Sequence, residues 1–492
     1  MLRRKLIPIA ITAFWLIMMS LLARQELGRR AQIHSGTAGA YEVSDTWMGI
    51  YIASKDGAET RIGYMRTQSI PKVDGGDEGV EYRLTLKLAT QLLSFPTEIA
   101  LRGNTWISRE NGLQRVSFSV DSFKEHVMNA TGYAKGDVFH IDIETAGETF
   151  PMSFPIQKNL MVSGGLGTTT LHIPSLEIGD TVRVPTFDPL TFSYSQYSTI
   201  TCVGTDTFTF DGETFPVRIL ETEVNGITSK SWVTLQNEAV KVQTSFGFHL
   251  KKILPEEALK HTDPTDAIEF LDTVAIRPAG LQPFRGAKRM LIQLSGLPQN
   301  ADPPNDDIQK MLDPLKYEII PSASVESDLP DPETYLIGDP FVQVDHPTIT
   351  DLRDTILGNI ESPAEQARAI YDWVWLNILK KPVLSFPSAL DIAKTREGDC
   401  NEHTVLFTAL ARSAGIPTRM AIGVVWSDQL DGFYYHAWPE VHIDKAWLPM
   451  DPTLGQPTAD ATHIKFLEGN MNTWPKLMTY LGQVQIEVLE IE

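Results

Sequence analysis

The chain has 492 residues, of which 42% are hydrophobic, so it holds enough apolar side chains for about three folded domains and is not a disordered chain. It carries 42 basic and 62 acidic residues, a net charge of −20, which argues against nucleic-acid binding because phosphate contacts need a basic surface. Its two cysteines exclude a disulfide-stabilised scaffold and any metal site built from cysteines alone.

The N-terminus predicts a membrane anchor. Residues 6–23 form an uncharged apolar stretch that follows three basic residues at positions 3–5. As a helix this stretch is about 27 Å long, close to the thickness of a bilayer core. A cleaved signal peptide is the alternative, but the stretch is long and Leu21 and Ala23 form a poor cleavage site. We therefore expect residues 1–30 to hold a cytoplasmic N-terminus and a signal-anchor helix, with the bulk of the chain extracytoplasmic.

Residues 36–253 are expected to form a β-rich region of antiparallel sheets. Several segments alternate apolar and polar residues, which is typical of strands with one exposed face. The clearest examples are Glu81–Lys87, Gln114–Val120 and Val138–Ile143. Cys202 lies in another strand-like run with no histidine or cysteine nearby, so we interpret it as a small buried apolar side chain.

Proline and acidic residues gather in three stretches, at 254–266, 297–307 and 327–339. This composition disfavours helices and central strands, so it predicts linkers or long loops. Between the first two stretches, Gly286–Ser295 predicts a strand. We assign residues 267–330 to a small intermediate β module.

From about residue 340 the pattern changes to helices followed by strands. Ser362-Pro-Ala-Glu has the form of a capping box with proline at the first helical position, and it predicts a helix. A short helix is expected after Ser388. Another begins just after Cys400 and ends before Gly415. Strands are then expected at residues 419–426, 433–443 and 447–450.

Cys400, His436 and Asp451 are the candidate catalytic residues. Cys400 lies at the predicted start of an amphipathic helix, where unpaired N–H groups and the helix dipole favour a thiolate. His436 lies on a strand and Asp451 follows it by 15 residues. A turn near residue 445 would pair the two strands and bring imidazole and carboxylate to the same end of a hairpin. The carboxylate could then orient the imidazole, whose other nitrogen would face the thiol.

The segments around these residues resemble the transglutaminase-like (papain-like) core domain. They read EGDCNEHTVLFTALARSAGIPTRMAIGVV and FYYHAWPEVHIDKAWLPMDPT, preceded by the helix AIYDWVWLNI. The resemblance covers roughly residues 340–470 and implies an α+β protein with a catalytic domain at 340–475. It also implies that Cys400 is the nucleophile, His436 the general base and acid, and Asp451 the residue that orients the histidine. The N-terminal β region is more faintly similar to open half-barrel modules of bacterial envelope proteins, which implies a periplasmic location.

The resemblance does not identify the oxyanion-stabilising side chain. The backbone N–H of Cys400 is one candidate donor, and Trp373 and Trp375 of the upstream helix are others, although aromatic residues in such a helix are more often core. Asp460 and His463 follow the site closely in sequence. They either line the cleft or simply pack beside it.

A zinc site is the alternative to a catalytic role for these residues. Cys400, His403, His436 and Asp451 are ligand types that zinc accepts, but the spacing of Cys400 and His403 alone is a weak signal. Structural roles are expected for Glu402 and His403 in the first turn of the helix. We therefore expect no metal and no cofactor, and the sequence has no calcium-binding loop of the Asp-rich, Gly-centred kind.

The chemistry implied is acyl transfer to or from a protein or peptide substrate. With water as acceptor the enzyme hydrolyses peptide or amide bonds, whereas a lysine amine would make it a cross-linking transglutaminase. Hydrolysis is favoured because water is always present and nothing in the sequence indicates an amine site. The competing hypothesis is a non-catalytic module, whose β-rich region at 41–330 docks an envelope protein.

Overall fold

The computed structural model describes residues 43–492 apart from short gaps, so the predicted anchor at 6–23 lies outside the described residues. The gaps are 54–58, 93–94, 123–124, 146–147, 157–160, 163–175, 189–192, 225–226, 237, 245–247, 261–274, 299–300, 322–328, 340, 382–387, 470–476, 478–479 and 481–482. None of the helices in the described part has both the length and the apolar composition that a membrane crossing needs.

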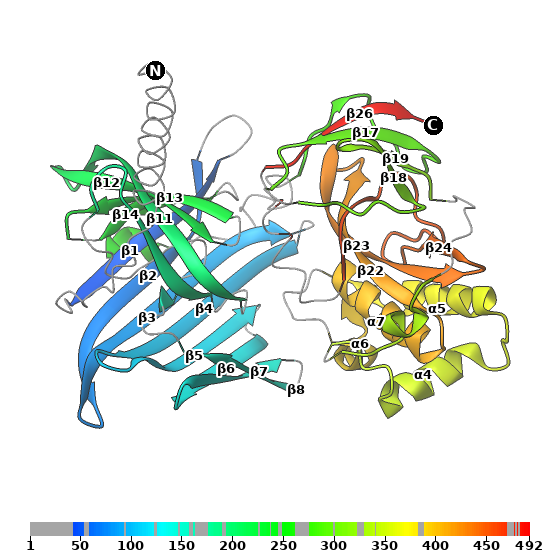
Figure 1. Cartoon of the computed structure of the whole chain (residues 1–492), viewed down its shortest axis with the longest axis horizontal. Coiled ribbons are helices and arrows are strands. Elements are labelled where there is room, and N and C mark those ends of the chain that lie inside the picture. Colours follow the sequence, from blue (N-terminus) through cyan, green and yellow to red (C-terminus); the bar gives the residue numbers. More distant parts are fainter. Residues whose placement is uncertain are drawn as a thin grey trace, which may run out of the picture.

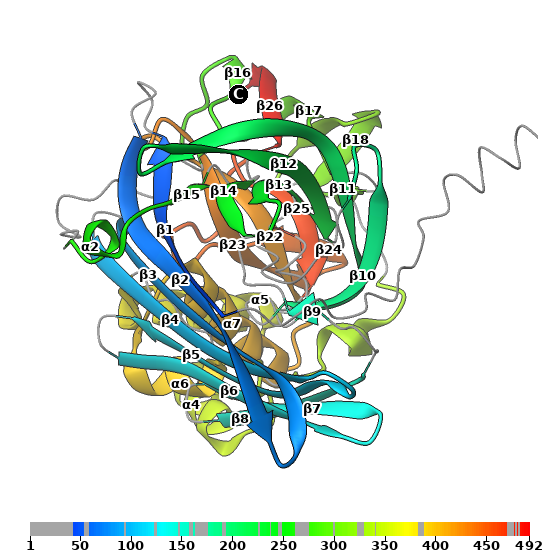
Figure 2. The ribbon, with the colours of Figure 1, turned by 90° about the vertical axis from the view of Figure 1, so that its left-hand side faces the viewer.

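The N-terminal half is one 15-stranded sheet, in the order β8-β7-β6-β5-β4-β3-β2-β1-β15-β14-β13-β12-β11-β10-β9. Neighbouring strands of this sheet are antiparallel, except β9 and β10, which are parallel. Figures 1 and 2 show that the sheet is strongly curved and open. The predicted antiparallel strands are thus confirmed, in a single sheet. The strands are β1 (Ser44–Ala53), β2 (Glu59–Asp74), β3 (Asp77–Leu92), β4 (Phe95–Ser108), β5 (Gly112–Ser122), β6 (Glu125–Lys135), β7 (Val138–Thr145), β8 (Glu148–Pro155), β9 (Met161–Val162), β10 (Thr181–Asp188), β11 (Ser193–Phe210), β12 (Glu213–Val224), β13 (Ile227–Thr234), β14 (Ala239–Thr244) and β15 (Phe248–Lys252).

Side-chain alternation explains why these segments are strands. In β5, Val116, Phe118 and Val120 are buried while Arg115 and Ser117 are exposed, so one face of the sheet is covered and the other meets solvent. The buried side chains belong to a core of aliphatic and aromatic residues inside the curve of the sheet. Cys202 is fully buried in a second, smaller core, as predicted.

The C-terminal half contains two further sheets that share one hydrophobic core. The five-stranded sheet has the order β16-β26-β17-β19-β18, and the four-stranded sheet has the order β24-β23-β22-β25. The strands are β16 (Ala279–Gly280), β17 (Met290–Ser295), β18 (Gln309–Asp313), β19 (Lys316–Ile319), β22 (Thr418–Ser427), β23 (Gly432–Ile443), β24 (Ala446–Pro449), β25 (Ile464–Gly469) and β26 (Gln485–Ile491). Two strands of the expected intermediate module, β16 and β17, therefore pair with β26, a strand that lies beyond residue 475. Where the domain boundaries fall stays a prediction.

Among the described residues, four helices pack together beside the four-stranded sheet and enclose a separate apolar core (Figure 1). They are α4 (Pro347–Leu357), α5 (Pro363–Asn377), α6 (Ala389–Thr395) and α7 (Cys400–Ser413). Between them, β20 (Leu379–Lys380) pairs in parallel with β21 (Glu397–Gly398). The predicted helices and strands of this half are confirmed. The predicted capping box at Ser362 is not: its side chain makes no cap bond, and only its carbonyl accepts the Gln366 N–H, at 2.8 Å.

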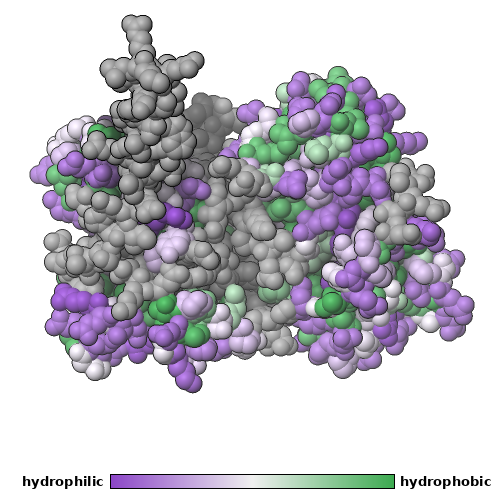
Figure 3. Space-filling model, in the orientation of Figure 1, coloured by the Kyte–Doolittle hydropathy of each residue, from purple (hydrophilic) through white to green (hydrophobic). Residues whose placement is uncertain are grey.

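Two of the proline-rich stretches contain short helical turns that the composition argument excluded. They are α2 (Pro255–Ala258) and the 3-10 turn η2 (Pro332–Tyr335). Both begin with proline, whose missing N–H has no helical partner at that position in any case. Hydrophilic residues cover most of the coloured surface in Figure 3.

Candidate active site

Cys400 is the first residue of α7, at a helix start built from two acidic side chains. The Asp399 carboxylate accepts the Asn401 N–H at 2.9 Å, and the Glu402 carboxylate accepts the Asp399 N–H at 2.9 Å. This reciprocal pair is a capping box, and it fixes the turn on which the thiol sits. Cys400 is partly exposed, whereas Cys202 is buried.

The acidic neighbours oppose ionisation of the thiol. Burial raises the pKa of Cys400 well above its ordinary value, the Asp399 charge raises it further, and a hydrogen bond with the Ala437 backbone works in the other direction. Burial and the Asp399 charge also raise the pKa of Glu402 well above its ordinary range. The helix start alone therefore does not produce the expected thiolate, which needs an additional cation.

The fold brings the strand that carries His436 against this helix start. The Thr404 hydroxyl, one helical turn after Cys400, donates to the carbonyl of Ala437 at 3.0 Å. Ala437 follows His436 on β23 and its backbone also bonds with Cys400. The start of α7 is thus fastened to β23 at the residue next to His436.

His436 and Asp451 form a buried pair. The His436 Nε2 to Asp451 Oδ2 distance is 2.8 Å, and both side chains are almost fully buried. Asp444 and Lys445 have positive φ and form the two-residue turn between β23 and β24. Extending the register of this hairpin would place His436 opposite Thr453, two residues from Asp451. The hairpin expected from the sequence is confirmed.

The Asp451 carboxylate is fully used as an acceptor. Its Oδ1 accepts the N–H groups of Thr453 and Leu454 at 2.8 and 2.9 Å. Burial alone would raise its pKa, but the His436 charge and hydrogen bonds from His436 and His463 outweigh burial and lower the pKa of Asp451. Asp451 is therefore ionised at neutral pH.

His463 is a second histidine on the same carboxylate. Its Nε2 lies 3.1 Å from Asp451 Oδ2, and its Nδ1 lies 3.1 Å from the carbonyl oxygen of Asp460. The Trp438 indole packs against both histidines, stacked on His436 and edge-on to His463. The sequence placed Asp460 and His463 near the site without assigning them a contact with Asp451, since no periodicity links residues 451 and 463.

Of the two candidate tryptophans, Trp375 reaches the loop that carries Asp451. A Cβ added to Gly455 in this loop would lie 2.6 Å from its ring. The Lys380 ammonium sits 3.2 Å above the Trp375 ring centroid, on the short strand paired with Gly398, just before Cys400. Trp373 instead lies at the edge of the helical core, under Arg396.

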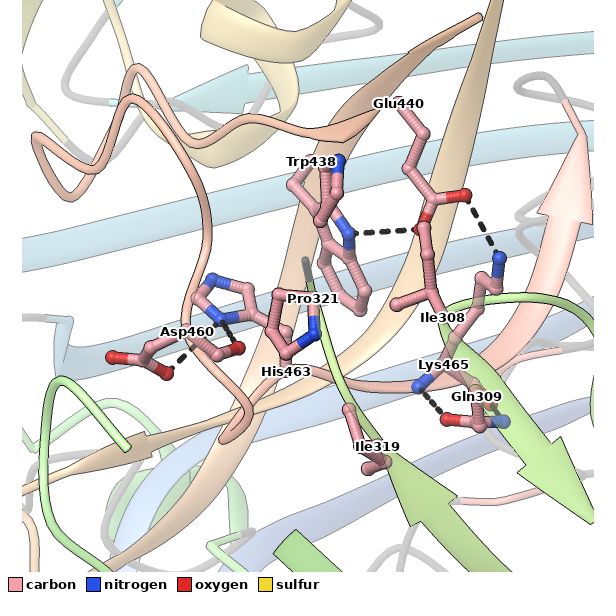
Figure 4. A pocket seen from close by; sticks show the side chains of 10 residues that line it. Ile308, Gln309, Ile319, Pro321, Trp438, Glu440, Asp460, His463 and Lys465 are labelled. Carbon is pink, nitrogen blue, oxygen red and sulfur yellow. Dashed lines mark hydrogen bonds and ion pairs between the residues drawn. The ribbon is translucent and has the colours of Figure 1, made fainter. Parts of the chain in front are cut away.

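A small pocket lies beside His463 and Trp438 (Figure 4). In Figure 4, Asp460 and His463 lie on one side of it, and Glu440 and Lys465 on the other, with Trp438 between them. Its lining residues are Ile308, Gln309, Ile319, Pro321, Trp438, Glu440, Pro449, Asp460, His463 and Lys465.

The four possible zinc ligands named from the sequence, Cys400, His403, His436 and Asp451, are not the group that the fold brings together. Among the described residues at this site, the metal-ligating atoms that lie within 4.8 Å of one another belong to His436, Asp451 and His463. Both Nε2 atoms of that group already bond to Asp451. His403 lies elsewhere: its Nδ1 contacts the Asp399 carbonyl at 2.6 Å, and burial lowers the pKa of His403 to about 4.

Part of the C-terminal half resembles known proteins. Residues 350–452 match the model of the transglutaminase-like superfamily. Kyphoscoliosis peptidase of Mus musculus is 26% identical over 131 residues, which cover 24% of this chain and 20% of that protein. The chain thus spans about a fifth of the length of this curated relative.

Solved structures with some likeness are also known. A candidate cysteine protease from Cytophaga hutchinsonii is 17% identical, with 42% of this chain and 85% of that chain covered and a TM-score of 0.27. A beta-barrel-like protein of unknown function from Brucella abortus is 9% identical, with 42% and 96% covered and a TM-score of 0.30. The family match, which contains Cys400, His436 and Asp451, shows that residues 350–452 form a transglutaminase-like domain.

Proposed function

We propose that this chain is a cysteine acyl-transfer enzyme that hydrolyses peptide or amide bonds of a protein substrate through a thioester. The observation that carries the proposal is the buried 2.8 Å bond from His436 Nε2 to Asp451, on a strand fastened to the helix that begins at Cys400. A carboxylate on Nε2 holds the proton there and leaves Nδ1 as the base for the thiol.

In the proposed reaction, the Cys400 thiol transfers its proton to His436 Nδ1 and attacks the substrate carbonyl carbon. The tetrahedral intermediate collapses, the carbon–nitrogen bond breaks, and the leaving amine takes the proton from His436. Water then loses a proton to His436 and attacks the thioester. The carbon–sulfur bond breaks, the acid leaves, and the Cys400 sulfur takes the proton back from His436. Transfer to a lysine amine instead of water is the alternative outcome and uses the same three residues.

The first test is the reactivity of Cys400. Iodoacetamide should alkylate Cys400 faster than Cys202 in the native protein, because Cys400 is partly exposed and adjacent to a base. His436→Ala should slow this labelling strongly. His442→Gln, in the same strand with its ring packed on Trp447, is the matched control and should leave it unchanged. Equal, slow labelling of both cysteines would favour the non-catalytic binding module.

The second test is turnover. Cys400→Ala should abolish thioester formation with an acyl probe, and His436→Ala should be nearly as damaging. Asp451→Asn should lower turnover severely, since loss of the corresponding carboxylate in a serine triad costs about 10⁴. An active Cys400→Ala protein would overturn the assignment. Comparing the proteins processed in cells with and without Cys400→Ala would identify the substrate, and the product would separate hydrolysis from amine transfer.

We also propose, from the apolar stretch at 6–23, that the enzyme is tethered to a membrane with its bulk outside the cytoplasm. The protein should stay in the membrane pellet after carbonate washing. Recovery of a soluble form that begins near residue 24 would contradict the anchor.

A further inference from the structure

We propose that His463 is a positioning residue of this site: a cation held between Asp451 and Asp460 that fixes the Asp451 carboxylate and weakens its hold on protonated His436. The effect of His463 on catalysis rests on the proposed function, but the charge of His463 and its effect on His436 can be measured without turnover.

The first support is the set of atoms around the His463 ring. Nε2 faces the Asp451 carboxylate at 3.1 Å, and Nδ1 faces the Asp460 carbonyl at 3.1 Å and the Asp460 carboxylate at 3.4 Å. Each of these oxygens can only accept a hydrogen bond, because Asp451 is ionised. A neutral imidazole has a single N–H, so both contacts can be hydrogen bonds only when the ring carries two protons and a positive charge.

The second support is that Asp460 is itself held in place. Its Oδ2 accepts the Gly286 N–H at 2.8 Å and the Gln456 amide at 2.6 Å. Its Oδ1 accepts the Thr462 N–H at 2.9 Å. Burial opposes a charge on His463, but the bonds to Asp451 and Asp460 outweigh it and raise the pKa of His463 to about 9.

The charged groups around His463 come from three directions. Asp451 and Asp460 lie on its own loop, and the His436 ring from β23 is 5.7 Å away between centroids. Glu440 and Lys465 lie across the small pocket and pair with each other at 2.8 Å, so they add little net charge (Figure 4). The Asp451 charge is therefore shared between two histidines.

This sharing has a consequence for His436. A lone carboxylate would strongly favour protonated His436 and slow the release of its proton to the leaving amine. The charge on His463, 5.7 Å from the His436 ring, opposes that protonation. At an effective dielectric constant near 20, a unit charge at this distance shifts a proton equilibrium by about one to two pH units.

The test uses His463→Gln in the full-length chain, because a glutamine amide can still donate to Asp451 but carries no charge. Histidine-labelled ¹⁵N NMR of the native protein at pH 8 should show a ring with both nitrogens protonated, whose signal is absent in His463→Gln and retained in His436→Ala. In a Cys400→Ala background, where the thiol cannot couple to the titration, His463→Gln should move the His436 transition upward by about one to two pH units. His442→Gln should not move it.

A His463 ring with one protonated nitrogen at pH 8 would overturn the proposal, and this measurement on the native protein does not depend on how well the variant folds. A folded His463→Gln protein with an unchanged His436 transition would overturn it as well. Failure of the proposed function gives a different result, an active Cys400→Ala protein, and leaves both NMR readouts in place.

Discussion

Lys465→Met would remove a cation from a buried ion-pair cluster that joins the five-stranded sheet to the four-stranded sheet. Lys465 is 1% exposed, and its ammonium lies 2.6 Å from Asp306, 2.8 Å from Glu440 and 2.8 Å from Glu468. Arg419 contacts the same three carboxylates at 2.5, 2.6 and 3.0 Å. Three acids thus share two cations, and the substitution would leave Arg419 as their only partner in this cluster.

The expected loss of stability follows from this count. Removing one partner of a buried ion pair costs about 3–5 kcal/mol, because the remaining charges stay buried without compensation. Arg419 still pairs with all three acids, and methionine fills most of the lysine volume, so we expect the lower end, about 3 kcal/mol. Glu440, at 1% exposure, carries most of the cost.

Urea denaturation followed by tryptophan fluorescence measures this loss, since the Trp438 indole donates to Glu440 at 3.3 Å. Lys381→Met is the matched control: its ion pair with Glu397, at 2.7 Å, has side chains 40% and 38% exposed, so its removal should cost less than about 1 kcal/mol. Adding Asp306→Asn to Lys465→Met should recover part of the loss, because it removes surplus negative charge. If the free energy of unfolding of Lys465→Met lies within about 1 kcal/mol of that of Lys381→Met, the buried cluster does not stabilise the protein in this way.

Three further results are expected. Burial would raise the pKa of Asp306, but the charges of Lys465 and Arg419 outweigh burial and lower it. Ionised Asp306 therefore stabilises the fold at pH values above the pKa that it has in the unfolded chain, and this stabilisation is lost as the pH falls below about 4. In acid, the free energy of unfolding of Asp306→Asn should depend less steeply on pH than that of the native protein. The pKa of His463 is raised to about 9, so the stabilisation by its charge is complete below about pH 6.5 and lost as the pH rises through 9. Thermal melts should therefore show a larger difference in melting temperature between the native and His463→Gln proteins at about pH 6.5 than above about pH 9. Gly455→Ala should destabilise by more than about 1 kcal/mol and shift tryptophan fluorescence, because φ is +72° there and the Trp375 ring lies 2.6 Å from the added Cβ; a neutral result would contradict the packing.

Local sequence signals predicted the local parts of the site well. The helix that starts at Cys400 and the hairpin from His436 to Asp451 both follow from short-range patterns: an amphipathic run that ends before Gly415, strand-like segments and a turn near residue 445. Their juxtaposition needed the family resemblance, since nothing in the spacing of residues 400 and 436 brings a helix start to a strand.

Long-range contacts escaped prediction for physical reasons. Asp306 lies in a proline-rich acidic stretch interpreted as a linker, yet it is held in the buried cluster by cations from β22 and β25, more than a hundred residues later. The preference of Cys400 for its thiol form depends on the burial of the thiol and on the Asp399 charge beside it, which the helix-dipole argument did not include. The contact of His463 with Asp451 depends on the path of the intervening loop, which bridges Asp451 to Gln456.

The place of β26 has a consequence for the order of events during synthesis. This strand, Gln485–Ile491, pairs with both β16 and β17, and its side chains Ile486 and Val488 pack in one core with Ile422 and Val424 of β22. The strand beside His436 is therefore fully supported only after residue 491 has left the ribosome. A nascent chain that already contains Cys400, His436 and Asp451 still lacks this support until β26 has been made.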